Sequence, residues 1–343
     1  MIFGCIFMYE SNVFLSSIEF AIITVEGGVR ILRRFNHMIT LSSGQTLEVT
    51  IDKTDEKPIG ILHILHGVSE HKDRYDGIVE YFCKRGFHVI RHNHRGHGKK
   101  IEESTRGHFN SLKELVEDLK EIRDTFKPEL NNDLPYILLG HSMGSLVARK
   151  YVHDYPNDVN ILILSGTVVY SNIQGKLNLY GLKFVNLFLG NRTKSKLINN
   201  LAFKTPNRKH KELNKDNNWI SESEENKKIY EEDPYTGYSV SHRVFLETVK
   251  AAEQSKKSSY IKKQNLNMPI LLLSGKEDHF GGFGTGIKKL ATLYKRNGVK
   301  HVTVQLYKNK RHEVLFETNQ FVVYEHIFNW LMTQIKQLEK EEQ

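Results

Sequence analysis

One serine of this chain stands in a sequence context that favours nucleophilic chemistry. The pentapeptide GHSMG at 140–144 directly follows a short apolar run at 136–139 and directly precedes a helical pattern at 145–153. A turn between a strand and a helix is too tight for neighbouring Cβ atoms, so it needs glycine on both sides of the serine. It also presents the hydroxyl at a helix N-terminus, where free N–H groups favour a developing negative charge. The pattern therefore predicts Ser142 as a nucleophile rather than as a bystander in a glycine-rich turn.

An acid and a histidine follow this serine at the places where its partners are needed. A hydroxyl is a weak nucleophile until a base accepts its proton, and a third group must orient that base. When the nucleophile lies on a strand-turn-helix, the acid comes next along the chain and the histidine comes last. Asp278 follows the apolar run at 270–273, and His312 follows the alternating run at 301–307. We predict Asp278 as the acid and His312 as the base, with Glu277 as the competing acid.

The same chemistry requires an oxyanion hole, which consists of two backbone N–H groups that face the charged oxygen of the tetrahedral intermediate. One N–H group is expected from Met143, the residue after the serine. The other is expected from the loop after an early strand, where His66, Gly67 and Val68 follow the apolar run at 61–65. We assign this second role to the N–H of Val68, and we expect His66 to order the loop.

Three histidines, His92, His94 and His97, lie so close in the sequence that a metal site must be weighed. A binuclear metallohydrolase would need an aspartate just before the third histidine, and Gly96 stands there. No second group of ligands with a carboxylate accompanies them in the sequence. We therefore predict no metal and no cofactor, and we expect these histidines to shape their loop.

The composition is that of a globular protein with a moderately basic surface. The chain has 343 residues, 39% of them hydrophobic, which is ample for one large core with an insertion. Its net charge of +9 is spread along the sequence without a zinc-finger spacing or a basic helix, so we expect no nucleic-acid partner. Two cysteines provide no disulfide framework and favour the reducing cytoplasm.

Residues 1–37 carry no pattern that a sheet would need. The apolar segment at 2–9 has no basic residue before it, and Glu10 and Glu19 then interrupt the apolar run. A signal peptide would need a positive flank, and a membrane span would need about 20 apolar residues. We expect residues 1–37 to be an extension, with the first well-patterned strand only after Met38.

After this segment, short apolar runs alternate with amphipathic helical patterns, which is typical of a mainly parallel sheet with helices on both faces. The runs at 136–139, 161–164 and 270–273 are nearly all aliphatic, as in strands that are buried on both faces. The alternating run at 46–51 suits an antiparallel leading strand, and the one at 301–307 suits the edge of the sheet. Helices are expected at 112–126, 287–294 and 321–338.

The stretch 171–255 breaks this alternation, because it carries polar helical patterns and no convincing strand. Apolar strand patterns lie on both sides of it, so we predict an inserted helical cap between core segments 38–170 and 256–343. Residues 177–189 are more apolar than a surface helix needs, which suits either a helix packed on the core or a lid that faces lipid. From this segment we predict the substrate-binding residues Leu182, Phe184, Val185 and Phe188.

Four sequence motifs occur in this order along the chain: HGVSEH at 66–71 followed by Arg74 and Tyr75, HRGHG at 94–98, GHSMGS at 140–145 and RHE at 311–313. They resemble the α/β-hydrolases of the monoacylglycerol lipase and lysophospholipase branch, which is also called serine aminopeptidase-like. The resemblance implies an α/β-hydrolase fold, a triad of Ser142, Asp278 and His312, and a cap inserted over the pocket. The chain departs from the branch at Asn93, where aspartate is usual, and at His279, where proline usually follows the acid.

Together these features predict a serine hydrolase that cleaves carboxylic esters through an acyl-enzyme. The resemblance and the apolar part of the cap favour lipid monoesters, either monoacylglycerols or lysophospholipids. A serine peptidase of the aminopeptidase type is the alternative, because the acidic stretch at 222–233 could hold a substrate amine. A binding protein without activity is disfavoured, because all three members of the predicted triad are present. We expect a cytoplasmic protein, with transient membrane contact through the cap left open.

Overall fold

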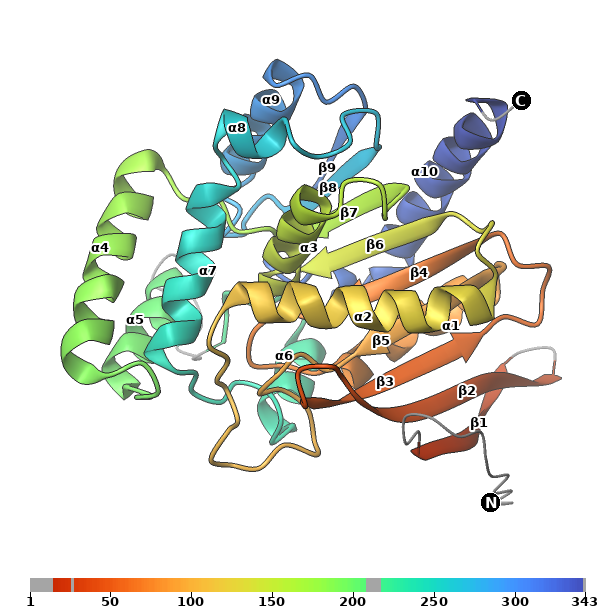
Figure 1. Ribbon diagram of the computed structural model, residues 1–343, viewed down its shortest axis with the longest axis horizontal. Helices are drawn as coiled ribbons and strands as arrows, with labels where there is room; N and C mark the ends of the chain where they lie inside the picture. Colours follow the sequence, from red (N-terminus) through yellow and green to blue (C-terminus); the bar gives the residue numbers. More distant parts are fainter. Residues whose placement is uncertain (1–14, 26–27, 208–216, 342–343) are drawn as a thin grey trace.

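The computed structural model describes residues 15–25, 28–207 and 217–341. The strands in these residues are β1 (Leu15–Val25), β2 (Gly28–Thr40), β3 (Thr46–Lys53), β4 (Gly60–Leu65), β5 (Phe87–His92), β6 (Tyr136–His141), β7 (Ile161–Ser165), β8 (Ile270–Gly275) and β9 (Val302–Tyr307). They form one sheet in the order β1-β2-β3-β5-β4-β6-β7-β8-β9 (Figure 1). Strands β4 to β9 are parallel to one another, and β1, β2 and β3 are antiparallel to their neighbours. The predicted fold class, a mainly parallel sheet, is confirmed.

Helices cover both faces of this sheet. In chain order they are η1 (Lys72–Tyr75, a short 3-10 helix), α1 (Asp76–Cys83), α2 (Leu112–Leu130), α3 (Met143–Asp154), α4 (Asn172–Leu189), α5 (Lys196–Asn207), α6 (Glu224–Glu232), α7 (His242–Gln254), α8 (Ser258–Ile261), α9 (Thr285–Arg296), η2 (Val314–Phe316, also 3-10) and α10 (Gln320–Glu341). Helices α2, α3 and α9 pack on one face, and α1 and α10 pack on the other (Figure 1).

The aliphatic strands explain why the core has two halves. In β7, Leu162 and Leu164 join the core beneath α3, whereas Ile161 and Ile163 join the core beneath α1 and α10. Successive side chains of a strand point to opposite faces, so an unbroken aliphatic run fills both halves at once. The strands predicted from such runs are therefore confirmed.

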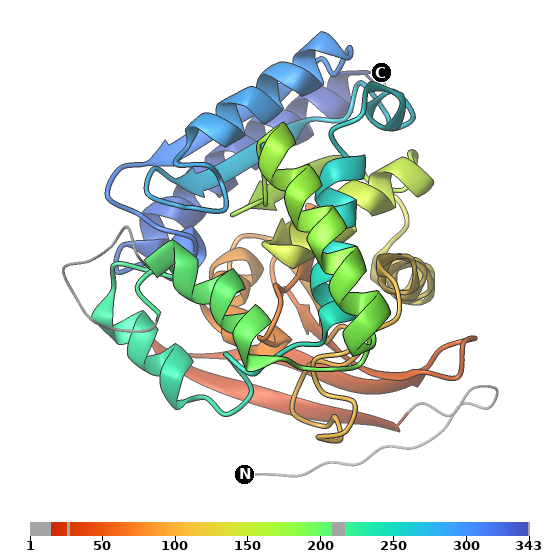
Figure 2. The ribbon, with the colours of Figure 1, turned by 90° about the vertical axis from the view of Figure 1, so that its left-hand side faces the viewer.

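Helices α4, α5, α6 and α7 all lie between β7 and β8, in the stretch where we predict the cap. The described residues of that stretch contain no strand. Figures 1 and 2 show these helices gathered beyond the end of the sheet to which β6 points. Across the described parts of the chain, no helix is both long and apolar enough to cross a membrane.

The sheet begins earlier than we predicted. Strand β2 pairs with β3 from Arg33 to Thr40, so the boundary expected at residue 38 falls inside a paired strand. The side chain of Arg34 donates to the fully buried carboxylate of Asp52 at 2.6 Å. Residues 1–37 are therefore not wholly an extension outside the sheet, although 1–14 lie outside the described residues. Local alternation did not reveal β2, because its polar side chains are held by ion pairs to residues elsewhere in the chain.

Arg34→Ala should lower the free energy of unfolding by about 1–3 kcal/mol, because the buried carboxylate of Asp52 loses a charged donor. Equilibrium urea denaturation measures this loss. Arg33→Ala is the matched control, because Arg33 pairs with Asp55 at the surface, where the two side chains are 50% and 60% exposed. The control should cost about 0.5 kcal/mol or less. Equal losses in the two variants would contradict a structural role for β2.

Candidate active site

Ser142 lies on the turn between β6 and α3, with φ 51° and ψ −117°. A non-glycine residue seldom adopts positive φ, and such strain persists only where the surrounding structure enforces it. A Cβ on Gly140 would lie 2.5 Å from the carbonyl oxygen of Gly144, and a Cβ on Gly144 would lie 2.3 Å from that of Leu65. Backbone packing therefore requires both glycines, as predicted for a turn between a strand and a helix, and it holds Ser142 at the start of α3.

The ring of His312 connects Ser142 to Asp278. Its Nε2 lies 2.9 Å from Oγ of Ser142, and its Nδ1 lies 3.0 Å from Oδ1 of Asp278. His312 and Asp278 are buried, whereas Ser142 is partly exposed. The acidic residue that reaches the ring is Asp278 and not the competing Glu277. The structure thus brings together the three residues named from the sequence, and their catalytic role stays a prediction.

The opposite charges of Asp278 and His312 stabilise each other. Burial opposes ionisation of Asp278, but the charge of His312 and the hydrogen bonds to the carboxylate hold its pKa below the usual value. One of these bonds comes from the N–H of Phe280 at 2.9 Å, and the carboxylate also accepts the hydroxyl of Ser274 at 3.2 Å. Burial lowers the pKa of His312, but the carboxylate of Asp278 outweighs it and raises this pKa above the ordinary value. The arrangement can therefore stabilise an imidazolium formed when His312 takes a proton.

The loop after β4 approaches Ser142 closely. A Cβ on Gly67 would lie 3.1 Å from the Cβ of Ser142, and Val68 lines the cavity beside it. His66 holds this loop. Its Nε2 accepts the backbone N–H of His94 at 3.0 Å, so the ring proton lies on Nδ1, which donates to the carbonyl of Gly67 at 2.7 Å. The N–H of Met143 belongs to the first turn of α3, where N–H groups lack acceptors within the helix. Val68 and Met143, the expected oxyanion donors, both lie beside the serine, and their role stays a prediction.

The histidine-rich loop lies behind His66. His92, His94 and His97 are buried, and burial lowers the pKa of each ring, which keeps the rings neutral. The rings of His66 and His94 contact each other, with centroids 4.4 Å apart. No group of three or more His, Cys, Asp or Glu residues in the described ranges is arranged to hold a metal ion.

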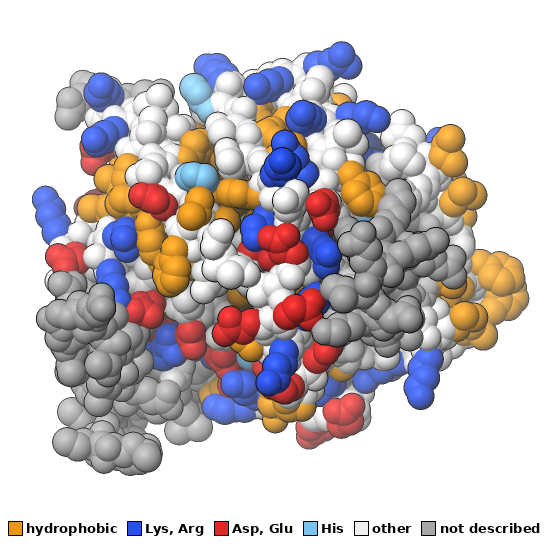
Figure 3. Space-filling view, turned by 180° about the vertical axis from the view of Figure 1, so that it is seen from behind, with side chains coloured by type: hydrophobic (Ala, Val, Ile, Leu, Met, Phe, Trp, Pro, Cys, Tyr) orange, Lys and Arg blue, Asp and Glu red, His pale blue; other side chains and the backbone are white. Residues whose placement is uncertain are grey.

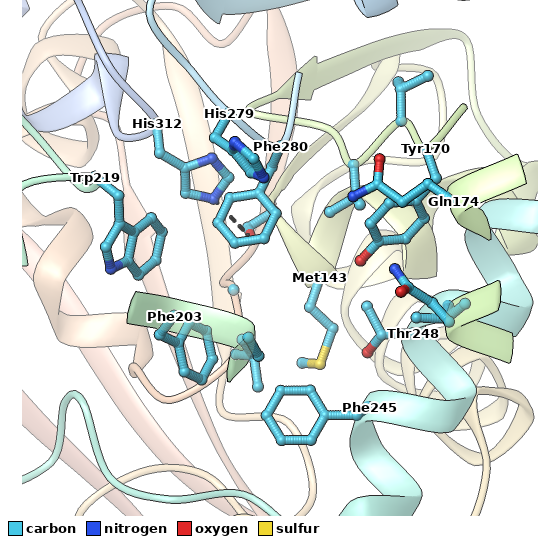
Figure 4. A pocket seen from close by; sticks show the side chains of 18 of the residues that line it. Met143, Tyr170, Gln174, Phe203, Trp219, Phe245, Thr248, His279, Phe280 and His312 are labelled. Carbon is cyan, nitrogen blue, oxygen red and sulfur yellow. Dashed lines mark hydrogen bonds between the residues drawn. The ribbon is translucent and has the colours of Figure 1, made fainter. Parts of the chain in front are cut away.

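A cavity of about 690 Å³ opens at the serine, between the loops of the sheet and the cap helices. Figure 4 shows the aromatic side chains of Phe203 and Trp219 on one side of it. The polar groups of Tyr170, Gln174 and Thr248 lie on the opposite side. The cavity therefore presents both aromatic and polar side chains beside Ser142.

Helix α4 turns one face to this cavity. Of the four residues predicted from it, Leu182 and Val185 line the cavity, whereas Phe184 and Phe188 do not. The side chains of these two phenylalanines are 64% and 65% exposed, and their ring centroids lie 4.4 Å apart. The cavity does not support Phe184 and Phe188 as binding residues: Phe184 points about 100° or more away from Leu182 and Val185 around the helix, and Phe188 lies one turn beyond Val185, the last residue of α4 that lines the cavity.

Several aromatic residues of the site carry no sequence motif. The rings of Trp219 and Phe280 contact the ring of His312, at centroid distances of 5.2 and 5.0 Å. Phe245 of α7 also lines the cavity. Only Phe280 had a signal in the sequence, because it lies two residues after Asp278.

The acidic stretch at 222–233 does not line the cavity with its carboxylates. Within it, Glu224, Glu225 and Glu231 are exposed. The stretch therefore does not provide the amine site that we offered for a peptidase.

Comparison with known families matches residues 56–319 to the Hydrolase_4 family, described as serine aminopeptidase, S33. The monoacylglycerol lipase of Mycolicibacterium smegmatis is 32% identical over 40% of this chain and 48% of the lipase. Phospholipase YtpA of Bacillus subtilis is 33% identical over 36% of this chain and 45% of that protein. The matched part thus spans about half the length of these two relatives. Mouse monoglyceride lipase is 24% identical over 83% of this chain and 89% of its own.

Solved structures share the fold. A thermostable carboxyl esterase from Bacillus coagulans has a TM-score of 0.81 and 24% identity, over 88% of this chain and 99% of the esterase. The monoacylglycerol lipase of Paleococcus ferrophilus has a TM-score of 0.64 and 22% identity, over 84% of this chain and the whole of that one. These similarities confirm the α/β-hydrolase fold.

Asp278→Asn should lower kcat for ester hydrolysis by about 10⁴-fold, the size of the loss in the serine-protease triad, because an amide neither holds the required tautomer of His312 nor stabilises its charge. The pH profile of kcat/KM gives a second readout. His312 must be neutral to accept a proton, so activity falls as the pH drops through its raised pKa. The acidic limb of the wild type should therefore lie above pH ~6.5, the ordinary histidine pKa.

The matched control is Glu277→Gln, which should keep the wild-type kcat and the wild-type acidic limb. Loss of activity in this control, with near-normal turnover in Asp278→Asn, would reverse the choice of acid.

Proposed function

The chain belongs to the Hydrolase_4 family, described as serine aminopeptidase, S33, and we propose that it hydrolyses carboxylic esters through an acyl-enzyme on Ser142. The observation that carries this proposal is the hydrogen-bonded chain from Ser142 through His312 to Asp278. A serine hydroxyl so activated is a nucleophile for acyl transfer. The names of the similar proteins, which include lipases, a phospholipase and an esterase, support an ester as the substrate.

The reaction consists of two acyl transfers. Oγ of Ser142 attacks the ester carbonyl carbon while Nε2 of His312 takes the hydroxyl proton. The carbonyl oxygen becomes an oxyanion, to which the N–H groups of Val68 and Met143 donate. The intermediate collapses as His312 gives the proton to the leaving alcohol. Water, deprotonated by His312, then attacks the acyl carbon, and His312 returns the proton to Oγ of Ser142 as its bond to the acyl group breaks and the carboxylic acid is released.

Lipid monoesters, either monoacylglycerols or lysophospholipids, are the substrates that this cavity suits best. Its apolar lining from α4, α5 and α7 takes acyl CH₂ groups out of water, which contributes about 0.8 kcal/mol for each group. The hydroxyl and amide groups of Tyr170, Gln174 and Thr248 also line the cavity and suit a hydroxylated leaving group. An apolar acyl chain and a polar alcohol thus each find matching side chains in the cavity.

A peptidase of the aminopeptidase type is less well supported, although the family description carries that name. Such an enzyme binds a protonated amine, for which a carboxylate near the nucleophile is the natural partner. Glu70 and Glu313 line the cavity, but both carboxylates already bind Arg74. We therefore place the ester before the peptide.

A transient contact of the cap with a lipid surface is a further part of this proposal. Figure 3 shows hydrophobic side chains at the right-hand edge of the molecule, where α4 lies. Leu177 and Leu201 are both exposed and line the cavity, so this apolar surface continues into the site. A peripheral position on a membrane fits the expected cytoplasmic location, which stays a prediction. The exposed hydrophobic residues of α4 and α5 are Ile173, Leu177, Tyr180, Phe184, Leu187, Phe188, Leu189, Leu197 and Leu201.

The charges around this surface suit an anionic membrane. Residues 171–201 contain no aspartate or glutamate, and basic side chains near apolar ones favour binding to anionic lipid. The basic residues of the segment are Lys176, Lys183, Arg192, Lys194 and Lys196.

A series of monoacylglycerols tests the substrate. In the wild type, kcat/KM should rise about fourfold for each added CH₂ until the cavity is filled, which corresponds to ~0.8 kcal/mol per group. Leu182→Ser combined with Val185→Ser should flatten this dependence. Phe184→Ser, on another side of the same helix, is the matched control and should leave the dependence unchanged.

Ser142→Ala should abolish both ester hydrolysis and labelling by a fluorophosphonate while the protein stays folded.

For the monoacylglycerol series, a wild-type activity that does not depend on chain length, together with turnover of aminoacyl anilides, would move the assignment to a peptidase.

Phe184→Ser combined with Phe188→Ser should weaken binding to vesicles that contain anionic phospholipid by about tenfold or more, because burying a large apolar side chain contributes about 1.5–3 kcal/mol. Vesicle sedimentation measures the binding. Hydrolysis of a short, water-soluble ester should not change, since neither side chain lines the cavity. Phe321→Ser is the control, because Phe321 is 62% exposed but lies on α10. An equal loss in both variants would argue against contact through the cap.

A further inference from the structure

Three buried charged residues lie next to the cavity and take no part in the proposed proton transfers. Arg74 belongs to η1, Glu70 precedes that helix, and Glu313 directly follows His312. Their side chains are 4%, 3% and 4% exposed. Charged side chains are seldom buried to this degree unless each has a partner.

Arg74 binds both carboxylates at once. Its Nη1 donates to Oε2 of Glu70 at 2.5 Å and to Oε1 of Glu313 at 2.9 Å, and its Nη2 donates to Oε2 of Glu313 at 2.8 Å. The contact with Glu313 is bidentate, a geometry that a guanidinium provides and an ammonium does not. The ring of Tyr230, from α6 of the cap, stacks against the guanidinium at 4.9 Å. Arg74 is therefore held in one orientation by three elements.

The second oxygen of Glu70, Oε1, reaches the loop of His66, Gly67 and Val68 after β4, which we call the oxyanion loop. It accepts the backbone N–H of Gly67 and, at 3.0 Å, the hydroxyl of Tyr75. Gly67 immediately precedes Val68, the expected oxyanion donor. A glycine backbone has wide conformational freedom, so a bond at this position restricts where the N–H of Val68 points. Glu70 thus ties the oxyanion loop to Arg74.

Glu313 ties Arg74 to the loop that carries His312. Besides the two bonds from Arg74, its carboxylate accepts the side-chain amide of Asn226 from α6 at 3.0 Å. Its backbone N–H donates to the carbonyl of Ile220 at 2.8 Å. Because Glu313 and His312 share a peptide bond, anchoring the first restricts the second.

We propose that Glu70, Arg74 and Glu313 are positioning residues that hold the oxyanion loop and His312 in a fixed relation around Ser142. The inference rests on the proposed ester hydrolysis at that serine. Oxyanion donors stabilise a transition state only when they are aligned before the charge forms. A need for stability does not explain the cluster, because apolar residues in place of a buried ion pair are often as stable or more so.

Arg74→Lys and Glu313→Gln test this role. Lysine keeps the positive charge but cannot form the bidentate contact with Glu313. Glutamine keeps the shape of the glutamate side chain but removes its negative charge. Each variant should lower kcat for p-nitrophenyl butyrate by about ten- to a hundredfold, the cost of misplacing reacting groups by a fraction of an ångström to an ångström. KM should change by less than about threefold, because ground-state contacts are kept. Inhibition by a trifluoromethyl ketone, which forms an oxyanion on the serine, should weaken by the same factor as kcat/KM.

Arg91→Lys is the matched control. Arg91 is 1% exposed and pairs with Asp52 at 3.0 Å, but it does not line the cavity. This variant should lower the midpoint of thermal unfolding and leave kcat and ketone inhibition unchanged. If Arg74→Lys does not fold, Glu313→Gln decides, because its amide oxygen still accepts a bond from Arg74.

Folded Arg74→Lys and Glu313→Gln proteins with wild-type kcat and wild-type ketone inhibition would overturn the inference and leave ester hydrolysis intact. A wild-type protein that hydrolyses no ester would instead overturn the proposed function, and the inference with it.

Discussion

The tight backbone turn at Ser142 is the constraint on which the rest of the site depends. The carbonyl groups of Leu65 and Gly144 pass so close to this turn that no additional Cβ fits there. Two hydrogen bonds hold the strained Ser142. Its N–H donates to the carbonyl of Ser165 at 2.9 Å, and its carbonyl accepts the hydroxyl of Ser145 at 2.5 Å. Because parallel strands end at the same edge of a sheet, the loops after β4, β8 and β9 all reach this turn.

Burial then dictates how charge is arranged around the serine. A buried carboxylate is costly unless hydrogen bonds and an opposite charge compensate, and Asp278 has both. The cap takes part in this arrangement. The backbone N–H groups of His312 and Glu313 donate to the carbonyls of Trp219 and Ile220, at 3.4 and 2.8 Å. The segment before α6 therefore supports the loop of the histidine as well as covering the cavity.

Helix α4 is apolar on two sides for different physical reasons. Leu182 and Val185 face the cavity, where they meet the loops around the serine. Phe184 and Phe188 face outward, although a helix that only packs on a core needs one apolar stripe. An exposed apolar surface beside a cavity mouth is costly in water, and the proposed contact with a lipid surface would remove that cost.

Local sequence was enough to identify the residues that do the proposed chemistry. The glycines around Ser142 are required by steric limits within one turn. Asp278 and His312 follow strands that the aliphatic or alternating pattern of residues predicts directly. Local sequence was not enough to predict which side of α4 faces outward. The orientation of this helix is set by its packing on α7, where Asn186 donates to the carbonyl of His242 at 3.1 Å. It was also not enough for β2, whose ion pairs join residues far apart in the chain. Sequence alone thus predicted the proposed nucleophile, its proposed partners and strands β3 to β9, since each depends on neighbours along the chain. The tertiary structure decided which side chains surround them, because burial and long-range contacts exist only once the elements have packed together.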